Sequence, residues 1–346
     1  MKRNTMQLLP RLIPAGLILL LASQALPAQE PIRAKVEEVL VNVLVTTRNG
    51  RPIPNLKAEQ FRVFENGAEQ KINSVVAVDA PFSVGLVLDT SYSTVGKLGR
   101  IQDSAIEFLN EIHPDDEVMV VSFDDEVYLE TEFTRNKDGA ARAVKMTRTG
   151  QATVLYDGVY LALEQFEDQP FRMVMVLFTD GVDTRSRTGR GESIKFAREK
   201  NVTIYPIYFD TERDALYGNN TGQPLPTPGT IPGQGPVIVP GGNPLPFPSP
   251  TGGGSRNPGG VRAQYGQARG YLDQLAEASG GRRLNADGNL SNLSAVFAQI
   301  AAEMRALYTL AYTPPNPNGD GKFRKIVVKV DEPKAKVRNR KGYVAR

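Results

Sequence analysis

"VGLVLDTSYST", residues 84–94, is an apolar run that ends in alternating oxygen-bearing side chains. Such a run is typical of a strand that is buried on both faces in a mainly parallel sheet. Similar runs follow at Val118–Phe123, Met173–Phe178 and Val202–Phe209. Between the runs, apolar residues recur at helical spacing, as in Leu98–Ile112. The alternation predicts an α/β fold with a doubly wound, mainly parallel sheet over residues 82–307.

Oxygen-bearing side chains follow three segments of this predicted domain, and they make up one candidate site: Asp89, Ser91, Ser93, Thr153 and Asp180. Ligands of a doubly wound sheet bind beyond the carboxyl ends of the strands, so we expect these side chains to converge there. Two carboxylates and three hydroxyls, with no His or Cys nearby, suit a hard cation such as Mg²⁺. Mn²⁺ and Ca²⁺ remain alternatives.

A purely structural role is the alternative for the first part of this set. Asp and Ser commonly cap a helix by accepting hydrogen bonds from its free N–H groups, and Asp89 to Ser93 could do so. The additional presence of Thr153 and Asp180 favours a metal site. Asp157 and Asp183 lie near the same motifs but are not predicted to be ligands.

The motif also resembles a known family. DxSxS after the first strand, a Thr before "LYDG" (155–158) and "TDG" (179–181) after a later strand resemble the metal-ion-dependent adhesion site of von Willebrand factor A domains. The flanking stretches "VNVLVTTRNGRPIPNL", "FRVFENG" and "YTLAYTPPNPNGDGKFRKIVVKV" resemble bacterial VWFA-related domain proteins. The resemblance implies that the two serines and the threonine contact the metal. It implies that the two aspartates bind it directly or through water, and no motif position departs from the pattern.

Both flanks of the α/β domain are predicted to be β structure. Residues 31–80 contain alternating apolar residues and the turns Asn49-Gly50 and Asn66-Gly67, which are strong hairpin signals. Residues 308–346 are also predicted to form strands. Within them, residues 322–346 alternate basic and apolar positions, which favours the solvated face of strands over a nucleic-acid surface. We expect the two flanks to pair into one small β-sandwich-like unit.

One internal stretch lacks the pattern of either element. Residues 211–262 are crowded with Pro and Gly and are predicted to be a disordered insertion in the α/β domain. A linker is favoured over a proline-rich ligand for a groove-binding partner.

The N-terminus has the order of a secretory signal peptide. Lys2, Arg3 and Arg11 precede the apolar stretch 12–22, and small residues such as Ala25 and Ala28 follow it. We expect residues 1–28 to be removed, and an uncleaved N-terminal anchor is the alternative. These three cations account for the formal net charge of +3, since no acid precedes Glu30. No later segment approaches the roughly 20 apolar residues of a membrane span.

Cysteine is absent from the chain. An exported protein of this composition cannot use disulfides, so its stability must come from core packing and from any bound metal. We expect the protein to be exported in soluble form and to be periplasmic or secreted.

Catalytic classes lack their required residues. An aspartyl-phosphate phosphatase needs a second Asp two residues after the first, where Ser91 stands. The single histidine is His113, and neither a GxSxG elbow nor a phosphate-binding GxxxxGK[ST] loop occurs. The sequence therefore predicts a non-catalytic binding protein whose cation captures an Asp or Glu of a partner protein. A scaffolding envelope component, in which the metal only stabilises the fold, is the alternative, and a hydrolase comes third.

Overall fold

The computed structural model describes residues 38–76, 80–167, 169, 172–217, 258–316 and 319–345, and all of them belong to one compact unit, Glu37–Arg346. The predicted leader, residues 1–28, and residues 218–257 of the Pro/Gly-rich stretch lie outside the described residues. In the part of the chain that is described, no helix is both long and apolar enough to span a bilayer.

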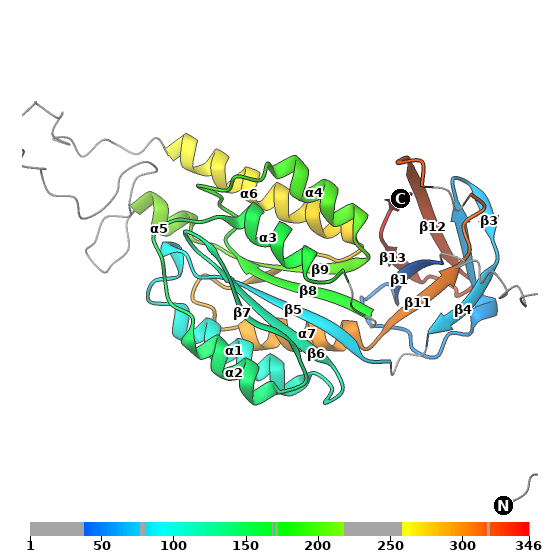
Figure 1. Cartoon of the computed structure of the whole chain (residues 1–346), viewed down its shortest axis with the longest axis horizontal. Coiled ribbons are helices and arrows are strands. Elements are labelled where there is room, and N and C mark those ends of the chain that lie inside the picture. The colour runs from blue at the N-terminus through cyan, green and yellow to red at the C-terminus, as the bar shows by residue number, and fades with distance from the viewer. Residues whose placement is uncertain are drawn as a thin grey trace, which may run out of the picture. The chain divides into compact units, whose positions relative to one another are not determined.

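A six-stranded sheet forms the centre of the α/β domain (Figure 1). Its strands, in spatial order, are β10 (Leu284–Ala286), β9 (Val202–Phe209), β8 (Arg172–Thr179), β5 (Phe82–Asp89), β6 (Glu117–Phe123) and β7 (Val127–Thr134). All neighbours are parallel except β6 and β7, which are antiparallel. The predicted doubly wound, mainly parallel sheet is therefore confirmed.

Helices cover both faces of this sheet (Figure 1). One face packs against α1 (Leu98–Glu111), α2 (Lys137–Met146) and α7 (Leu293–Met304). The other packs against α3 (Leu155–Glu164), α4 (Arg190–Glu199) and α6 (Pro258–Ser279). Every residue of β5 is buried, as expected of a central strand with helices on both faces.

The register of β5 and β8 brings their carboxyl ends together. Leu88 of β5 lies opposite Phe178 of β8 in the parallel pairing. The residues that come next, Asp89 on one strand and Thr179 and Asp180 on the other, therefore leave the sheet side by side.

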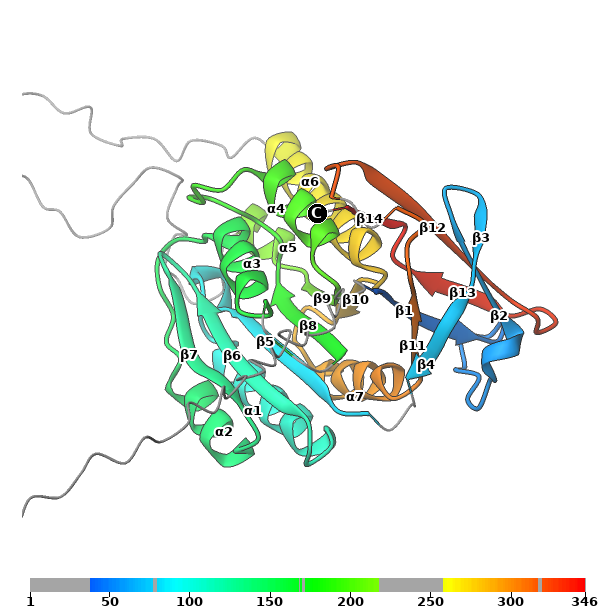
Figure 2. The same cartoon turned by 45° about the vertical axis from the view of Figure 1, so that its right-hand side comes forward.

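The two chain flanks form two antiparallel sheets that pack against each other (Figure 2). One has the order β13 (Lys336–Asn339), β1 (Val39–Thr46), β11 (Leu307–Tyr312) and β4 (Ile72–Val76). The other has the order β14 (Gly342–Val344), β12 (Phe323–Val330), β2 (Phe61–Glu65) and β3 (Ala68–Gln70). A short 3-10 helix, η1 (Ala58–Gln60), precedes β2. The predicted pairing of the two flanks is confirmed.

Alternation of side chains explains this packing. On β1, Val41 and Val43 face the core between the two small sheets, where Val63 and Ile326 also lie. On β12, Lys325 and Lys329 are exposed and Ile326 is buried, so these two basic residues lie on a solvated strand face, whereas Arg340 of the same C-terminal segment is buried. Asn66 and Gly67 both have positive φ, as the two-residue turn between β2 and β3 requires.

Strand β1 also packs against the α/β domain. Asn42 donates a hydrogen bond through Nδ2 to Thr203 Oγ1 of β9 at 3.2 Å and accepts one through Oδ1 from Thr309 Oγ1 at 2.7 Å. Leu44 belongs to the core that lies between the large sheet and α1 and α7. One strand therefore serves two cores.

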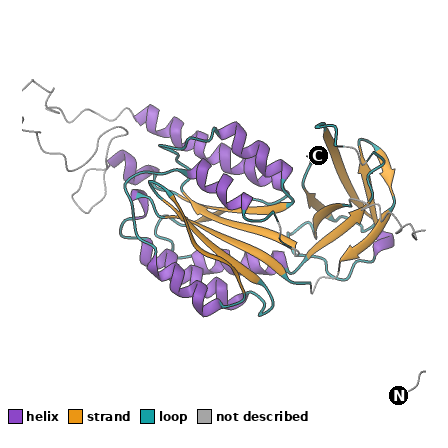
Figure 3. Cartoon of the chain, viewed as in Figure 1, coloured by secondary structure: helices purple, strands orange, loops and turns teal. Residues whose placement is uncertain are grey.

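The predicted disordered insertion, residues 211–262, was too wide at both ends. Helix α5 (Glu212–Tyr217) and the first turn of α6 lie within it, as the helices in Figure 3 illustrate. Helix α5 is stabilised by ion pairs from Asp214 to Lys97 at 2.9 Å and from Glu212 to Arg269 at 3.1 Å. Pro258 begins α6, a position where its missing N–H costs nothing. Local composition therefore gave the wrong boundaries, because tertiary ion pairs and a proline start extend the ordered region.

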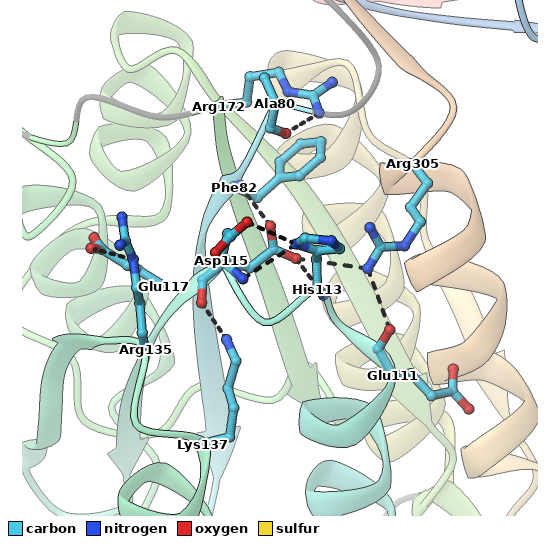
Figure 4. Close-up of polar contacts among 11 residues, drawn as sticks. Ala80, Phe82, Glu111, His113, Asp115, Glu117, Arg135, Lys137, Arg172 and Arg305 are labelled. Atoms are coloured by element: carbon cyan, nitrogen blue, oxygen red, sulfur yellow. Dashed lines mark hydrogen bonds and ion pairs between the residues drawn. The ribbon is translucent and has the colours of Figure 1, made fainter.

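The amino end of β5 is fixed by a buried carboxylate, Asp116, in the turn before β6. Its Oδ1 accepts a hydrogen bond from Phe82 N at 2.9 Å, and its Oδ2 accepts one from His113 N at 2.8 Å. Arg305 lies 3.9 Å from the same carboxylate, and Lys137 Nζ donates to the main-chain carbonyl of Asp116 (Figure 4). These contacts join the start of the strand to the turn after α1.

Candidate metal centre

Asp89, the last residue of β5, is fully buried. Its Oδ1 accepts hydrogen bonds from both the main-chain N–H (3.0 Å) and the hydroxyl of Ser91. Its Oδ2 accepts one from Thr179 Oγ1 at 2.6 Å. A carboxylate at the end of a central strand is thus held by donors from its own turn and from the neighbouring strand.

The DxSxS segment folds as one tight turn. The 3-10 turn η2 (Tyr92–Thr94) follows Ser91, and Thr94 donates both its N–H (3.0 Å) and its hydroxyl (2.7 Å) to the Ser91 carbonyl. This turn places Ser91 Oγ 3.2 Å from Ser93 Oγ. Three of the five candidate ligands therefore lie together.

This geometry argues against the helix-cap alternative. Helix α1 begins at Leu98 with Lys97 in the N-cap position, and no side chain caps it. Ser91, the N-cap of the preceding 3-10 turn, makes no capping hydrogen bond with its side chain. The hydroxyl of Ser91 instead donates to Asp89 and lies within hydrogen-bonding distance of the Ser93 hydroxyl.

Asp180 follows β8 and is also buried, with 2% of its surface exposed. Its Oδ1 accepts a hydrogen bond from Val182 N at 3.0 Å, and its Oδ2 accepts one from Thr211 Oγ1 at 2.7 Å. Burial raises the pKa of Asp180, and the nearby Ser93 of the DxSxS turn is among the polar groups that lower it. The fourth candidate ligand therefore lies near the first three.

Electrostatics at this edge disfavour two free carboxylates. Burial, and next the charge of Asp180, raise the pKa of Asp89 to about 7. Burial likewise raises the pKa of Asp180, against the opposing effects of its hydrogen bonds and of the Lys97 charge. A buried carboxylate is stabilised by a cation, and a divalent ion bound between these two would relieve both the burial cost and their mutual repulsion.

Thr153 lies in the loop between α2 and α3 and is buried. Its carbonyl accepts hydrogen bonds from the N–H groups of Thr184 (2.9 Å) and Arg185 (3.1 Å), and its N–H donates to Thr184 Oγ1 at 2.9 Å. Earlier in the same loop, Gly150 N donates to the carbonyl of Thr90 at 3.0 Å. The structure therefore fastens the Thr153 loop to the segments that follow β5 and β8, through main-chain contacts rather than through the threonine hydroxyl.

The two nearby aspartates bind main-chain groups. Asp183 accepts hydrogen bonds from Tyr156 N (3.3 Å) and from the hydroxyl of Ser186. Asp157 accepts them from Arg187 N (2.9 Å) and Thr188 N (2.7 Å). Both carboxylates fasten the loop after β8 to the start of α3.

Four residues around the site were not singled out from the sequence: Thr179, Thr211, Lys97 and Tyr265. Thr179 carries a signal, because it is the first residue of the "TDG" motif. Thr211 reaches Asp180 across 31 positions and Tyr265 reaches Thr211 across 54, so no local motif contains either contact.

The donor set fits a hard cation of modest ligand charge. Among the described residues, no group of three or more His, Cys, Asp or Glu side chains could hold a metal ion. The candidate site instead combines two carboxylates with hydroxyl oxygens. Mg²⁺ accepts such a set because it keeps several waters and binds few carboxylates.

Comparison with solved structures finds partial likenesses of low identity. A conserved hypothetical protein, BatB, from Bacteroides thetaiotaomicron is 18% identical, with a TM-score of 0.43 over 64% of this chain and 98% of its own. An aerotolerance-related membrane protein from Bacteroides fragilis is 14% identical, with a TM-score of 0.40 over the same shares. A manganese-loaded TRAP protein from Plasmodium vivax is 13% identical, with a TM-score of 0.30 over 42% of this chain and 60% of its own.

No curated protein sequence matches the chain. One family model does match, and its residues contain β5, the DxSxS turn, the Thr153 loop and Asp180. The match covers residues 84–182 and is described as the von Willebrand factor type A domain. By this match and by its doubly wound sheet, the chain contains a von Willebrand factor type A (VWA) domain.

Proposed function

We propose that this chain is an exported, non-catalytic binding protein whose VWA domain uses a divalent cation to capture an acidic group of a partner protein. The ligands in this proposal are Asp89, Ser91, Ser93, Thr153 and Asp180. The observation that carries it is the pair of buried carboxylates, Asp89 and Asp180, at adjacent strand ends among hydroxyl donors.

The chain's own residues prepare such a site. Thr179 and Ser91 fix the orientation of the Asp89 carboxylate, and Thr211 and Val182 fix that of Asp180. A bound Mg²⁺ would supply a coordination position open to an oxygen anion. Neutral hydroxyls make up much of the donor set, so the bound cation would keep part of its positive charge. This charge favours a carboxylate of a partner protein at the open position.

A surface next to the site supports a protein partner. The turn that carries the two serines continues into Val95, an apolar side chain that is 39% exposed. Tyr92, on the same turn, is half-buried. An acidic residue of a partner that reached the cation would bring its neighbours into contact with these side chains.

Export belongs to the same proposal. The order of charged, apolar and small residues in positions 1–28 supports a leader that is removed, and the absence of cysteine suits soluble export to a periplasm or medium. Mass spectrometry of the native protein tests this point. An intact Met1–Ala28 segment would contradict it.

A scaffolding role, in which the cation only stabilises the fold, is the second candidate. It is supported by β1, because Asn42 and Leu44 join the β-sandwich-like unit to the VWA domain. A rigid two-part body of this kind suits an envelope component that spaces other proteins apart.

Affinity capture from an envelope extract separates the two candidates. The mature chain is immobilised and exposed to extract in Mg²⁺ or in chelator, beside Asp180→Ala and the control Asp157→Ala. We expect one partner to be retained in Mg²⁺ by the wild type and the control, and to be lost in chelator and with Asp180→Ala. The scaffolding role would be supported if the partner were retained equally with and without chelator while the metal still raised the melting temperature of the chain.

A further inference from the structure

We infer that Thr211 and Tyr265 form a hydroxyl relay that positions Asp180 and thereby couples the affinity for the cation to helix α6. This inference rests on the proposed metal site. It adds two positioning residues that come from outside the matched segment 84–182.

The relay has a defined direction. Thr211 Oγ1 lies 2.7 Å from Asp180 Oδ2 and 2.7 Å from the hydroxyl oxygen of Tyr265. A hydroxyl has one hydrogen, and the ionised carboxylate can only accept, so Thr211 donates to Asp180. Tyr265 must then donate to Thr211.

Both relay residues are removed from solvent. Thr211 is 2% exposed and Tyr265 is 6% exposed. Burial raises the pKa of Tyr265, with the Asp180 charge as the next cause, so the phenol keeps its proton and remains a donor at neutral pH. Inside the protein, such a chain of hydrogen bonds holds its members in one arrangement.

Helix α6 is itself packed onto the Asp180 loop. Gly181, which follows Asp180, has φ +76, and a Cβ built there would lie 3.1 Å from Leu272 and 3.2 Å from Ala268. On the same helix, Arg269 forms an ion pair with Glu212 of α5 at 3.1 Å. The helix that carries Tyr265 therefore contacts both the loop after β8 and the helix after Thr211.

The consequence for metal binding follows from the geometry of Asp180. With Oδ2 held by Thr211 and Oδ1 held by Val182 N, the carboxylate has a fixed plane before any cation arrives. Loss of the relay leaves Oδ2 buried without its donor and free to turn away. Removal of outer partners of metal ligands typically weakens metal binding by roughly 10–100-fold.

The coupling is reciprocal. If the position of α6 affects the cation through Tyr265, then the bound cation must stabilise the start of α6 by the same free energy. Hydrogen exchange of amides near residues 258–266 should therefore slow when metal is added. A role of Tyr265 in packing alone would not produce this response.

Calorimetry with Mg²⁺ and Mn²⁺ on the full mature chain tests the inference, together with α6 hydrogen exchange with and without metal. The variants are Tyr265→Phe, Thr211→Val and Thr211→Ser. The matched control is Tyr271→Phe, which removes a buried hydroxyl from the same helix. This hydroxyl lies 3.1 Å from Ser193 Oγ and makes no hydrogen bond with Asp180. Melting in chelator confirms that each variant is folded.

We expect Tyr265→Phe and Thr211→Val to bind metal roughly 10–100-fold more weakly, Thr211→Ser to recover most of the affinity, and Tyr271→Phe to match wild type. Metal should protect α6 in wild type and in Tyr271→Phe, and not in Tyr265→Phe. Tyr265→Phe removes a single oxygen and is therefore the variant surest to fold. A wild-type metal affinity in this variant would overturn the relay while leaving the proposed metal site intact. Absence of binding in wild type would instead remove the proposed function.

Discussion

Buried aspartates lie at both ends of strand β5, but the groups around their carboxylates differ. At the amino end, Asp116 is 2% exposed and accepts hydrogen bonds from two main-chain N–H groups, with Arg305 nearby. At the carboxyl end, Asp89 and Asp180 are equally buried, yet they lie beside each other and among hydroxyls. Burial of a carboxylate is therefore no sign of function by itself, whereas the kind of donor around it is informative.

The physical distinction lies in what each carboxylate still lacks. Main-chain N–H groups are fixed in place, so Asp116 is compensated by the fold and holds two segments together. Hydroxyls can rotate and accept as well as donate, so those around Asp89 and Asp180 can turn their lone pairs toward a cation. The carboxylate at one end of the strand is compensated by main-chain donors, and those at the other end have the rotatable hydroxyls that the proposed metal site needs.

The largest expected effect is the loss of cation binding in Asp180→Ala. The variant removes one of two carboxylate ligands, and a Mg²⁺ site with so few protein anions does not tolerate that loss. Calorimetry with Mg²⁺ and Mn²⁺ should show no binding. Melting in chelator measures the balance of two opposite effects, because the repulsion of Asp89 is gone while Val182 N and the Thr211 hydroxyl lose their acceptor. Undiminished binding would remove the metal site.

The reverse pattern is expected for Asp116→Ala. Two buried N–H groups, of Phe82 and His113, would lose their acceptor, which should lower the free energy of unfolding by roughly 2–4 kcal/mol. Urea unfolding in chelator measures this loss, and calorimetry on the folded protein should give wild-type metal affinity. If Asp116→Ala lowered the metal affinity as well as the stability, the two ends of β5 would not differ in function as described.

The pH dependence of stability in chelator should reveal Asp89. Its pKa is raised from 3.8 to about 7 in the folded protein, so between these values the folded state holds a proton that the unfolded state has lost. Stability must therefore fall as the pH rises from about 4 to 7. Urea unfolding across this range checks the sign, and Asp89→Asn should show a smaller trend, since burial still raises the pKa of Asp180 in that variant. A flat wild-type profile would contradict the pKa shift.

The smallest expected effect is that of Arg305→Ala. Its NH2 is 3.9 Å from the Asp116 carboxylate, and the side chain is 45% exposed, so solvent screens the pair. We expect a loss of about 0.5 kcal/mol. Thermal melting beside Asp116→Ala shows whether the main-chain donors or the guanidinium compensate Asp116. A loss comparable to that of Asp116→Ala would favour the guanidinium.

Much of the fold could be predicted because its strands and turns are specified by patterns of a few neighbouring residues. The apolar run 84–88 and the turn Asn66-Gly67 each specify a local conformation, and the structure has both. The positions of Asp89 and Asp180 after their strands follow from the same pattern. Their convergence needed one more rule, that parallel neighbours end at the same edge of the sheet.

What the sequence did not reveal depends on contacts between distant residues. Asp116 lies in an ordinary turn, and only its approach to Phe82, 34 positions earlier, makes it structural. Thr211 stands at the border of a Pro/Gly-rich range whose composition suggests irregular chain. Its role follows from Asp180 and Tyr265, which no local pattern connects to it.

Strand β1 has a consequence for how the chain is made. It pairs with β11 and β13, so that Val39 lies opposite Tyr312 and Val43 opposite Asn339. During synthesis this strand emerges early and must wait for partners that lie more than 250 positions later. Closing so long a loop makes the pairing a late and slow step, while the VWA sheet can form from nearby segments. Until then β1 exposes unpaired strand edges, so a nascent chain needs protection at this strand.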